Sequence, residues 1–217
     1  MKAKETIAFF LGSFDPPHSG HDTAVRALLE ARGVGEVWIV PTGPRKMKKG
    51  VWVAPNKGTA RKERHSPVRA RVKLCKALVE GLGDARVKLF SEYSRQKHAS
   101  TLKALEFAQA LFPAKSFRLV TGSDLNPEAY SGGKELCERF PPLMVLRKGN
   151  PFPETPAIEC VTPKNPSPAS SSEIRERVAR GSTIAGLVPE KVREVIEEEG
   201  LYLARARKPS RQKTRQV

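Results

Sequence analysis

The stretch of sequence that decides the fold is GSFDPPHSGH, at residues 12–21. It follows the short apolar run of residues 7–11 and precedes a segment in which Ala24, Leu28 and Leu29 share one helical face. A strand, a glycine-containing turn and a helix start, in that order, are typical of ligand-binding loops in doubly wound α/β proteins. The free N–H groups and the dipole of a helix N-terminus favour an anion there. The sequence therefore predicts a phosphate-binding loop at residues 12–21.

Short β-branched or aromatic runs alternate with amphipathic segments along the chain. The predicted strands are residues 7–11, 37–40, 87–90, 117–121 and 143–146, with 158–161 as a weaker sixth. Two further predicted helices carry apolar faces, formed by Val68, Val72, Cys75, Val79 and Leu82 in one and by Leu102, Leu105 and Ala108 in the other. Such alternation, with right-handed crossovers, predicts an α/β fold. We expect a Rossmann-like, doubly wound, mostly parallel sheet of five to six strands with helices on both faces.

The C-terminal part of the chain carries start and stop signals for two helices. The three serines at residues 170–172 offer capping hydroxyls before the run EIRERVARG, which Gly181 can end in a left-handed conformation. Pro189 opens a second run, PEKVREVIEEE, which Gly200 closes. Residues 150–168 are rich in proline and are predicted to form an irregular surface connection.

Two of the four histidines lie three residues apart in the predicted loop. His18 and His21, at the start of a helix, are expected to project to the same side. Two imidazoles there can donate hydrogen bonds to phosphate oxygens and stabilise charge that develops in a transition state. Two alternatives stay open. Turn chemistry alone explains the Asp-Pro-Pro sequence at residues 15–17, and a His-x-x-His pair can bind a metal, although no third ligand has an obvious position, so we expect no resident metal.

The composition is that of a globular protein, with 39% hydrophobic and 29% charged residues among 217. This length suits one α/β domain, which we place at residues 1–203. No stretch approaches the roughly 20 apolar residues of a spanning helix, and the run at residues 7–11 is too short for a secretory signal. Three scattered cysteines form neither a disulfide framework nor a zinc pattern. We therefore expect a cytoplasmic protein with no membrane partner.

The net charge of +16 comes from 39 Lys and Arg against 23 Asp and Glu. Much of it lies in residues 45–64 and in the tail at residues 204–217, which has six basic residues and no acidic one. The tail lacks apolar periodicity, so it is predicted to be a disordered arm. A basic arm can bind nucleic acid or an acidic surface, or it can serve only solubility.

Three blocks of the sequence resemble one family. GSFDPPHSGH is similar to the G-x-F-D-P-x-H-x-G-H signature of the nucleotidyltransferase superfamily that shares the H-x-G-H motif. Residues 170–175, SSSEIR, resemble the I-S-S-T-x-I-R block of nicotinate (or nicotinamide) mononucleotide adenylyltransferases, with Ala169 in place of the isoleucine. Residues 187–192, LVPEKV, resemble their L-V-P-x-x-V block. The resemblance runs through roughly residues 7–203.

The resemblance implies transfer of AMP from ATP to nicotinate (or nicotinamide) mononucleotide, with release of pyrophosphate, in NAD biosynthesis. Mg²⁺ would arrive with ATP, held mostly by phosphates and water. His18 and His21 would be catalytic and would bind the triphosphate. The other residues that the resemblance assigns to ATP are Gly12, Ser13, Phe14, Lys46, Gly122, Asp124, Ser171, Ser172 and Arg175.

The acceptor block departs from the family pattern. ASTLKAL, at residues 99–105, stands where the family has S-Y-T-x-D-T-L, so the tyrosine and the aspartate are missing. We assign Ser100, Thr101 and Arg147 to acceptor binding. Two alternatives follow from the departure and the charge: a nucleotidyltransferase of the same superfamily with another phosphate acceptor, or a basic RNA-binding or assembly module that reuses the fold.

Overall fold

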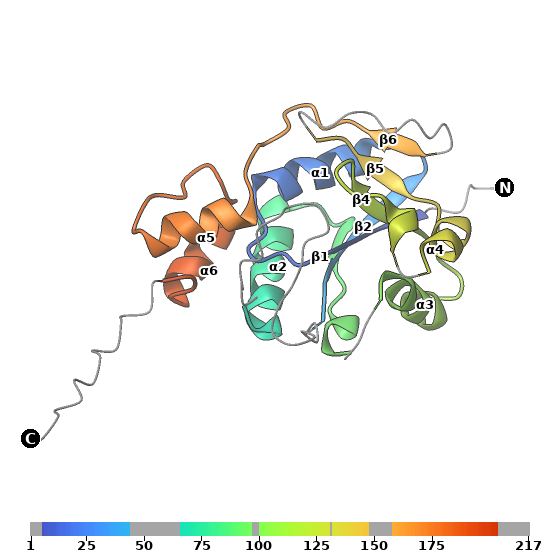
Figure 1. Cartoon of the computed structure of the whole chain (residues 1–217), viewed down its shortest axis with the longest axis horizontal. Helices are drawn as coiled ribbons and strands as arrows, with labels where there is room; N and C mark the ends of the chain where they lie inside the picture. The colour runs from blue at the N-terminus through green and yellow to red at the C-terminus, as the bar shows by residue number, and fades with distance from the viewer. Residues whose placement is uncertain (1–5, 44–65, 97–99, 131, 148–157, 204–217) are drawn as a thin grey trace, which may run out of the picture.

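The computed structural model describes residues 6–43, 66–96, 100–130, 132–147 and 158–203. They form a six-stranded sheet with helices on both faces (Figure 1). The strands are β1 (Thr6–Gly12), β2 (Val34–Pro41), β3 (Val87–Leu89), β4 (Ser116–Gly122), β5 (Leu143–Val145) and β6 (Glu159–Val161). The α-helices are α1 (Ser19–Glu30), α2 (Val68–Leu82), α3 (Thr101–Leu111), α4 (Gly133–Arg139), α5 (Ser171–Ala179) and α6 (Glu190–Glu198), and the short 3-10 helices are η2 (Glu92–Arg95) and η3 (Pro127–Ala129).

All strand pairs of the sheet are parallel, and the strand order is β3-β2-β1-β4-β5-β6. The predicted Rossmann-like, doubly wound sheet is confirmed, including the weaker sixth strand. Strand β1 pairs with β2 on one side and with β4 on the other, so the order reverses at the carboxyl ends of β1 and β4. Ligands bind doubly wound sheets at this switch point. Residues 12–21 follow β1 and residues 122–124 follow β4, so the topology brings two predicted motifs to that place.

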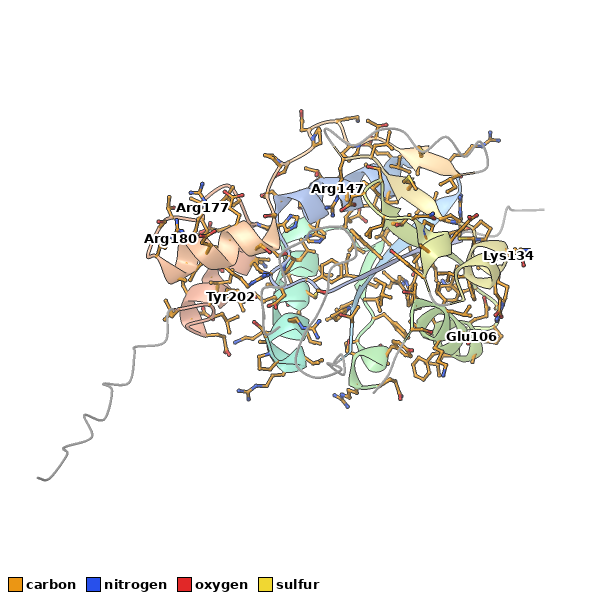
Figure 2. The ribbon with its side chains drawn as sticks, in the orientation of Figure 1. Glu106, Lys134, Arg147, Arg177, Arg180 and Tyr202 are labelled. Atoms are coloured by element: carbon orange, nitrogen blue, oxygen red, sulfur yellow. The ribbon has the colours of Figure 1, made fainter. Side chains whose placement is uncertain are left out.

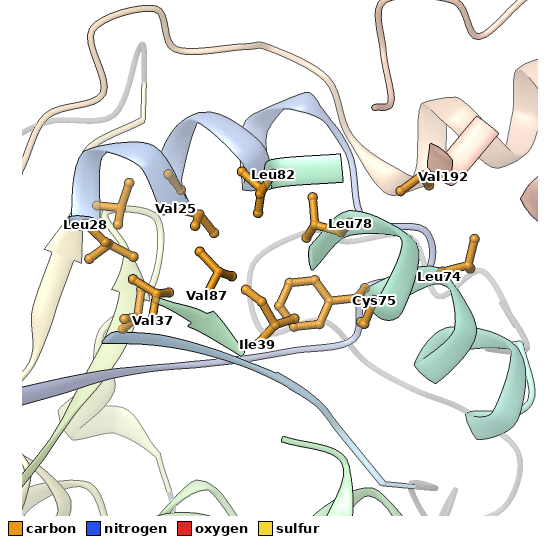
Figure 3. Close-up of a cluster of buried hydrophobic side chains, with 14 of the residues drawn as sticks. Val25, Leu28, Val37, Ile39, Leu74, Cys75, Leu78, Leu82, Val87 and Val192 are labelled. Atoms are coloured by element: carbon orange, nitrogen blue, oxygen red, sulfur yellow. The ribbon is translucent and has the colours of Figure 1, made fainter. Parts of the chain in front are cut away.

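The core lies in two layers, one on each face of the sheet. Helices α1 and α2 cover one face, and α3 and α4 cover the other (Figure 1). Figure 3 shows the first layer, in which Leu28 of α1, Leu74 and Leu78 of α2 and Ile39 of β2 belong to one cluster of buried side chains. The second layer is rich in rings: Phe9, Trp38, Phe90, Tyr93, Phe117 and Phe140. Burial on both faces explains why the strands read as continuous apolar runs rather than as alternating ones.

The two C-terminal helices extend the first layer, since Val192 and Ile196 of α6 are buried in the same core and α6 packs against α2. Ser170 caps α5, because its side chain accepts a hydrogen bond from the N–H of Glu173. Gly181 and Gly200 have φ of 69° and 56°, in the left-handed region that glycine adopts without cost. The predicted cap and both predicted helix ends are therefore confirmed.

Helix α4 and the two 3-10 helices were not predicted. Helix α4 has seven residues, of which only Gly133 and Leu136 are buried, so it shows no apolar period.

In α2 the buried face includes Leu74 and Leu78, whereas Val72 and Val79 are only half-buried. The face differs from the prediction because α2 packs against both the sheet and α6.

Within the described ranges, no helix combines the length and apolar character needed to cross a membrane. Cys75, Cys137 and Cys160 are free thiols.

Candidate functional site

Helix α1 begins at the two histidines of the loop. His18 is the N-cap of α1, and its Nδ1 accepts a hydrogen bond from the N–H of Gly20 at 3.1 Å. The Nδ1 of His21 accepts a hydrogen bond from the N–H of His18, also at 3.1 Å. The two ring centroids are 3.8 Å apart. This reciprocal capping holds both imidazoles together at the N-terminus of α1, in the way that the spacing predicted.

Each imidazole presents a single N–H donor. Because both Nδ1 atoms accept hydrogen bonds, the neutral ring carries its proton on Nε2. Burial, with a smaller effect of the Arg147 charge, lowers the pKa of His18 to about 4. Burial, the neighbouring His18 and Arg147 lower the pKa of His21 well below its ordinary value. Both rings are therefore neutral at pH 7, and their Nε2–H groups suit phosphate oxygens.

Phe14 shapes the loop. Its φ of 47° lies in the left-handed region, which is uncommon for a residue with a side chain. Its buried ring packs against His21, with the centroids 4.9 Å apart. A Cβ on Gly12 would lie 3.1 Å from the Phe14 ring, and a Cβ on Gly20 would lie 3.0 Å from the His18 ring. The loop's own rings thus give a second reason for both glycines, besides the predicted approach of a ligand.

The N-terminus of α5 lies against this loop. The hydroxyl of Ser171 donates to the carbonyl oxygen of Pro16 at 2.8 Å, across 155 positions of sequence. Arg175 donates from Nη1 to the carbonyl oxygen of Asp15 at 2.6 Å and from Nη2 to the hydroxyl of Ser172 at 3.1 Å. Two helix N-termini, each able to attract an anion, therefore meet at the loop.

Ser19 connects the loop to the third block of the resemblance. Its N–H donates to the carbonyl oxygen of Leu187 at 2.9 Å, and its hydroxyl donates to that of Gly186 at 2.8 Å. The three sequence blocks that resemble one family are therefore brought together in the folded chain.

The carboxyl ends of β4 and β5 contribute an ion pair. Asp124 contacts Nη1 of Arg147 at 3.2 Å, and the hydroxyl of Ser123 accepts the N–H of Arg147 at 3.0 Å. A Cβ on Gly122 would lie 2.4 Å from a carboxylate oxygen of Asp124 and 3.2 Å from Nε of Arg147. Gly122 thus leaves room for the pair. Arg147, which follows β5, is labelled in Figure 2, and its charge acts on both histidines.

An open cavity of about 570 Å³ adjoins Arg147 at the carboxyl ends of β5 and β6. It is lined by residues 146–147 and 162–166. The cavity extends the site along the edge of the sheet where this fold binds ligands. The sequence marked residues 162–166 only as part of a proline-rich connection, so this wall of the site was not predicted.

The two other residues assigned to the acceptor begin α3, on the opposite face of the sheet. The hydroxyl of Ser100 accepts the N–H of Lys103 at 3.2 Å and so caps α3, which Thr101 starts. The carbonyl oxygen of Ser100 accepts the hydroxyl of Tyr93 at 3.4 Å. These contacts tie Ser100 to α3 and η2 rather than to the histidine loop. Lys46 lies outside the described residues.

Arg71 of α2 is a buried member of the site that was not predicted. Its side chain donates to the carbonyl oxygens of Ser13 at 2.8 Å, Thr42 at 2.7 Å and Ser66 at 3.2 Å. It therefore joins the loop after β1 to the end of β2 and to the residues before α2. The sequence held one signal for this role: Arg71 lies four positions before Cys75, so its charge falls on the apolar face of the predicted helix.

Asp15 is also buried, and turn chemistry alone does not account for it. One carboxylate oxygen accepts the N–H of Ser66 at 2.9 Å, and the other accepts the hydroxyl of Tyr202 at 2.8 Å. No local pattern in the sequence signals either contact, because both partners are distant along the chain.

Together these features define a Rossmann-like α/β protein with a candidate anion-binding site at the switch point of its sheet. Paired neutral imidazoles, two helix N-termini and two arginines converge there. This is the arrangement expected of a protein that holds a nucleotide by its phosphates.

Comparison with known proteins identifies the family. Residues 9–177 match the model of the family described as "Cytidylyltransferase-like". A protein of Anaeromyxobacter dehalogenans (strain 2CP-1 / ATCC BAA-258), named "Probable nicotinate-nucleotide adenylyltransferase", is 33% identical over 93% of this chain and 99% of its own length. A protein of the same name from Geobacillus thermodenitrificans (strain NG80-2) is 31% identical over 92% of this chain and 87% of its own. The chain therefore belongs to the cytidylyltransferase-like family, and its resemblance to nicotinate-nucleotide adenylyltransferases is confirmed.

A solved structure shares the fold. Nicotinic acid mononucleotide adenylyltransferase from Plasmodium falciparum, complexed with NaAD, superposes with a TM-score of 0.71 at 18% identity, covering 91% of this chain and 97% of that one. The same enzyme complexed with APC gives a TM-score of 0.69 at 17% identity, with the same coverage.

Proposed function

We propose that this chain transfers the adenylyl group of ATP to nicotinate (or nicotinamide) mononucleotide and releases pyrophosphate, as a step of NAD biosynthesis. The observation that carries the proposal is the pair of neutral imidazoles, His18 and His21, held as Nε2–H donors beside the N-terminus of α5. The names of the relatives over nearly the whole chain support the same activity. The solved relatives complexed with NaAD and with APC support nucleotide ligands.

The reaction needs no covalent enzyme intermediate. An oxygen of the acceptor's phosphate attacks the α-phosphorus of ATP, the bond from that phosphorus to the bridging oxygen breaks, and pyrophosphate leaves with the bonding electrons. The protein's task is to hold two anions in line and to stabilise the charge on the transferring group. His18 and His21 supply hydrogen bonds to that group. Arg175, with Ser171 and Ser172 at the start of α5, holds the leaving phosphates.

Mg²⁺ would be supplied with ATP. In the described part of the chain, no cluster of three or more His, Cys, Asp or Glu side chains could hold a metal ion. Phosphate oxygens and water are the ligands that Mg²⁺ prefers in such sites, and the bound ion would screen the charge of the phosphates. The residues of this chain would bind the nucleotide around it.

The acceptor is the part of the proposal that needs the sharpest test. Arg147 lies close enough to influence both histidines and can attract the acceptor's phosphate, whereas Ser100 and Thr101 stand at the start of α3. Pyrophosphate release should be measured with ATP and, in parallel, nicotinate mononucleotide, nicotinamide mononucleotide and phosphopantetheine. Turnover with a pyridine mononucleotide supports the proposal. Turnover with phosphopantetheine alone would show that the proposed acceptor is wrong and would leave ATP as the adenylyl donor.

The distribution of charge favours one second role. The segments outside the described residues hold 18 of the 39 Lys and Arg but only three of the 23 Asp and Glu. The described part is therefore nearly neutral, and affinity for RNA or another acidic partner would depend on the basic residues at 45–64 and 204–217. Deleting residues 204–217, which removes six of these basic residues, should then weaken salt-sensitive RNA binding while leaving adenylyl transfer intact.

A further inference from the structure

The hydroxyl of Tyr202 reaches the histidine loop from the other end of the described chain. It donates a hydrogen bond to Asp15 at 2.8 Å, across 187 positions of sequence. The Asp15 side chain is almost fully buried, with 1% of the residue exposed, and its other oxygen accepts the N–H of Ser66. A buried carboxylate loses its hydration and needs such donors. Figure 2 shows Tyr202 where the C-terminal helices meet the body of the molecule.

Strained backbone lies at both ends of this hydrogen bond. Phe14 and Tyr202, with φ of 47° and 65°, are the non-glycine residues of positive φ in the part of the chain that the structure describes. Such conformations persist only where the surroundings hold them, and they cluster at functional sites. Tyr202 is the donor, and Phe14 immediately precedes the acceptor, Asp15.

Movement of Asp15 would be transmitted to the groups that face the phosphates. The ring of Phe14 packs on His21, and His18 follows Asp15 by three residues. The carbonyl oxygen of Asp15 also accepts Nη1 of Arg175 at 2.6 Å. One residue therefore fixes both the imidazole side and the guanidinium side of the site.

We propose that Tyr202 is a positioning residue for adenylyl transfer, which fixes residues 12–21 through Asp15 so that His18 and His21 meet the transferring group in line. The inference rests on the proposed function. Burial and the negative charge of Asp15 raise the pKa of Tyr202 well above its ordinary value, so the hydroxyl remains a donor across the working range of pH. Tyr202 itself touches no reacting atom.

The substitution Tyr202→Phe tests the proposal, because it removes the donor and keeps the ring. We expect kcat to fall about tenfold to a hundredfold, with little change in the KM for ATP, because misplaced groups lose interactions made in the transition state. Leu203→Ala is the matched control, since Leu203 is the next residue and is 63% exposed, and it should leave kcat unchanged. A lower melting temperature with an unchanged kcat in Tyr202→Phe would show a merely structural role and overturn the proposal.

A double-mutant cycle and a spectroscopic readout separate this inference from the proposed function. Combining Tyr202→Phe with Asp15→Ala, which removes the acceptor, should cost no more than Asp15→Ala alone, whereas additive losses would contradict the coupling. The imidazole proton resonances of the four histidines can be followed by NMR without any substrate. Tyr202→Phe should shift the resonances of two histidines, His18 and His21. Unshifted resonances would overturn the inference. Failure of the wild-type protein to turn over either pyridine mononucleotide would instead count against the proposed function.

Discussion

The Nδ1 atom of His21 accepts a hydrogen bond from the backbone N–H of His18, and the two imidazole rings lie with their centroids 3.8 Å apart. Both rings are thereby used in the helix cap and kept neutral by burial. Two protons added to this pair would be held close to each other and to Arg147. The free protein should therefore resist protonation of both imidazoles.

This resistance predicts a loss of stability in mild acid. The pKa of His18 falls from 6.5 to about 4 on folding, so the unfolded chain binds the proton first as the pH decreases through 6.5. The titration of His18 should therefore lower the free energy of unfolding by about 2 kcal/mol as the pH falls from 7.5 to 5. His18→Asn keeps a side chain suited to the N-cap and removes the titration. Urea unfolding at the two pH values should show the wild-type difference reduced by that amount in the variant, and an equal difference in both proteins would contradict the account.

Arg71 is predicted to hold the loops of the site by its forked geometry rather than by charge alone. Arg71→Lys keeps the charge but cannot reach the carbonyl oxygens of Ser13 and Thr42 together. Losing two charge-assisted hydrogen bonds in a buried place should lower the free energy of unfolding by about 3 kcal/mol. Arg69→Lys, at an exposed position of the same helix, should change it by less than about 0.5 kcal/mol. Equal midpoints of denaturation for the two variants would show that Arg71 does not connect these loops.

Gly122 is predicted to matter for binding more than for stability. In Gly122→Ala the new Cβ would lie 2.4 Å from a carboxylate oxygen of Asp124, and that flexible side chain can move away at small cost. Its displacement from Arg147 should raise the KM for ATP about tenfold, equivalent to about 1.4 kcal/mol, with little change in melting temperature. Gly81→Ala, in α2 with its nearest neighbour at 3.9 Å, is the control and should stabilise the helix by up to about 1 kcal/mol without affecting the KM. Unaltered kinetics in Gly122→Ala would exclude a role of the Asp124 pair in nucleotide binding.

The sequence was sufficient for the sheet and for the motifs that local patterns encode. Strands buried on both faces read as apolar runs, and glycines such as Gly181 and Gly200 marked helix ends through their backbone freedom. Helix α4 was missed because only two of its seven residues are buried, so no period of 3.6 residues develops.

The supporting contacts of the site were beyond reach of local patterns. Asp15 and Tyr202 are 187 positions apart, and Tyr202 follows α6, which packs against α2. Arg71 carried a readable signal, a charge on an apolar helical face, but its acceptors are backbone carbonyl oxygens that no motif specifies. Local patterns in the sequence therefore led to candidate phosphate-binding groups, whereas the contacts of Arg71 and Tyr202 came only from the structure.

The most direct measurement follows the phosphorus atoms of ATP. The protein should be incubated with nicotinate mononucleotide, Mg²⁺ and ATP labelled with ³²P at either the α or the γ position, with His18→Ala as the matched variant. The account predicts that the α label enters a dinucleotide and that the γ label appears in pyrophosphate, with both rates reduced about a hundredfold or more in His18→Ala. Transfer of the γ label to the acceptor, or equal rates in the variant, would contradict adenylyl transfer at the His18–His21 site.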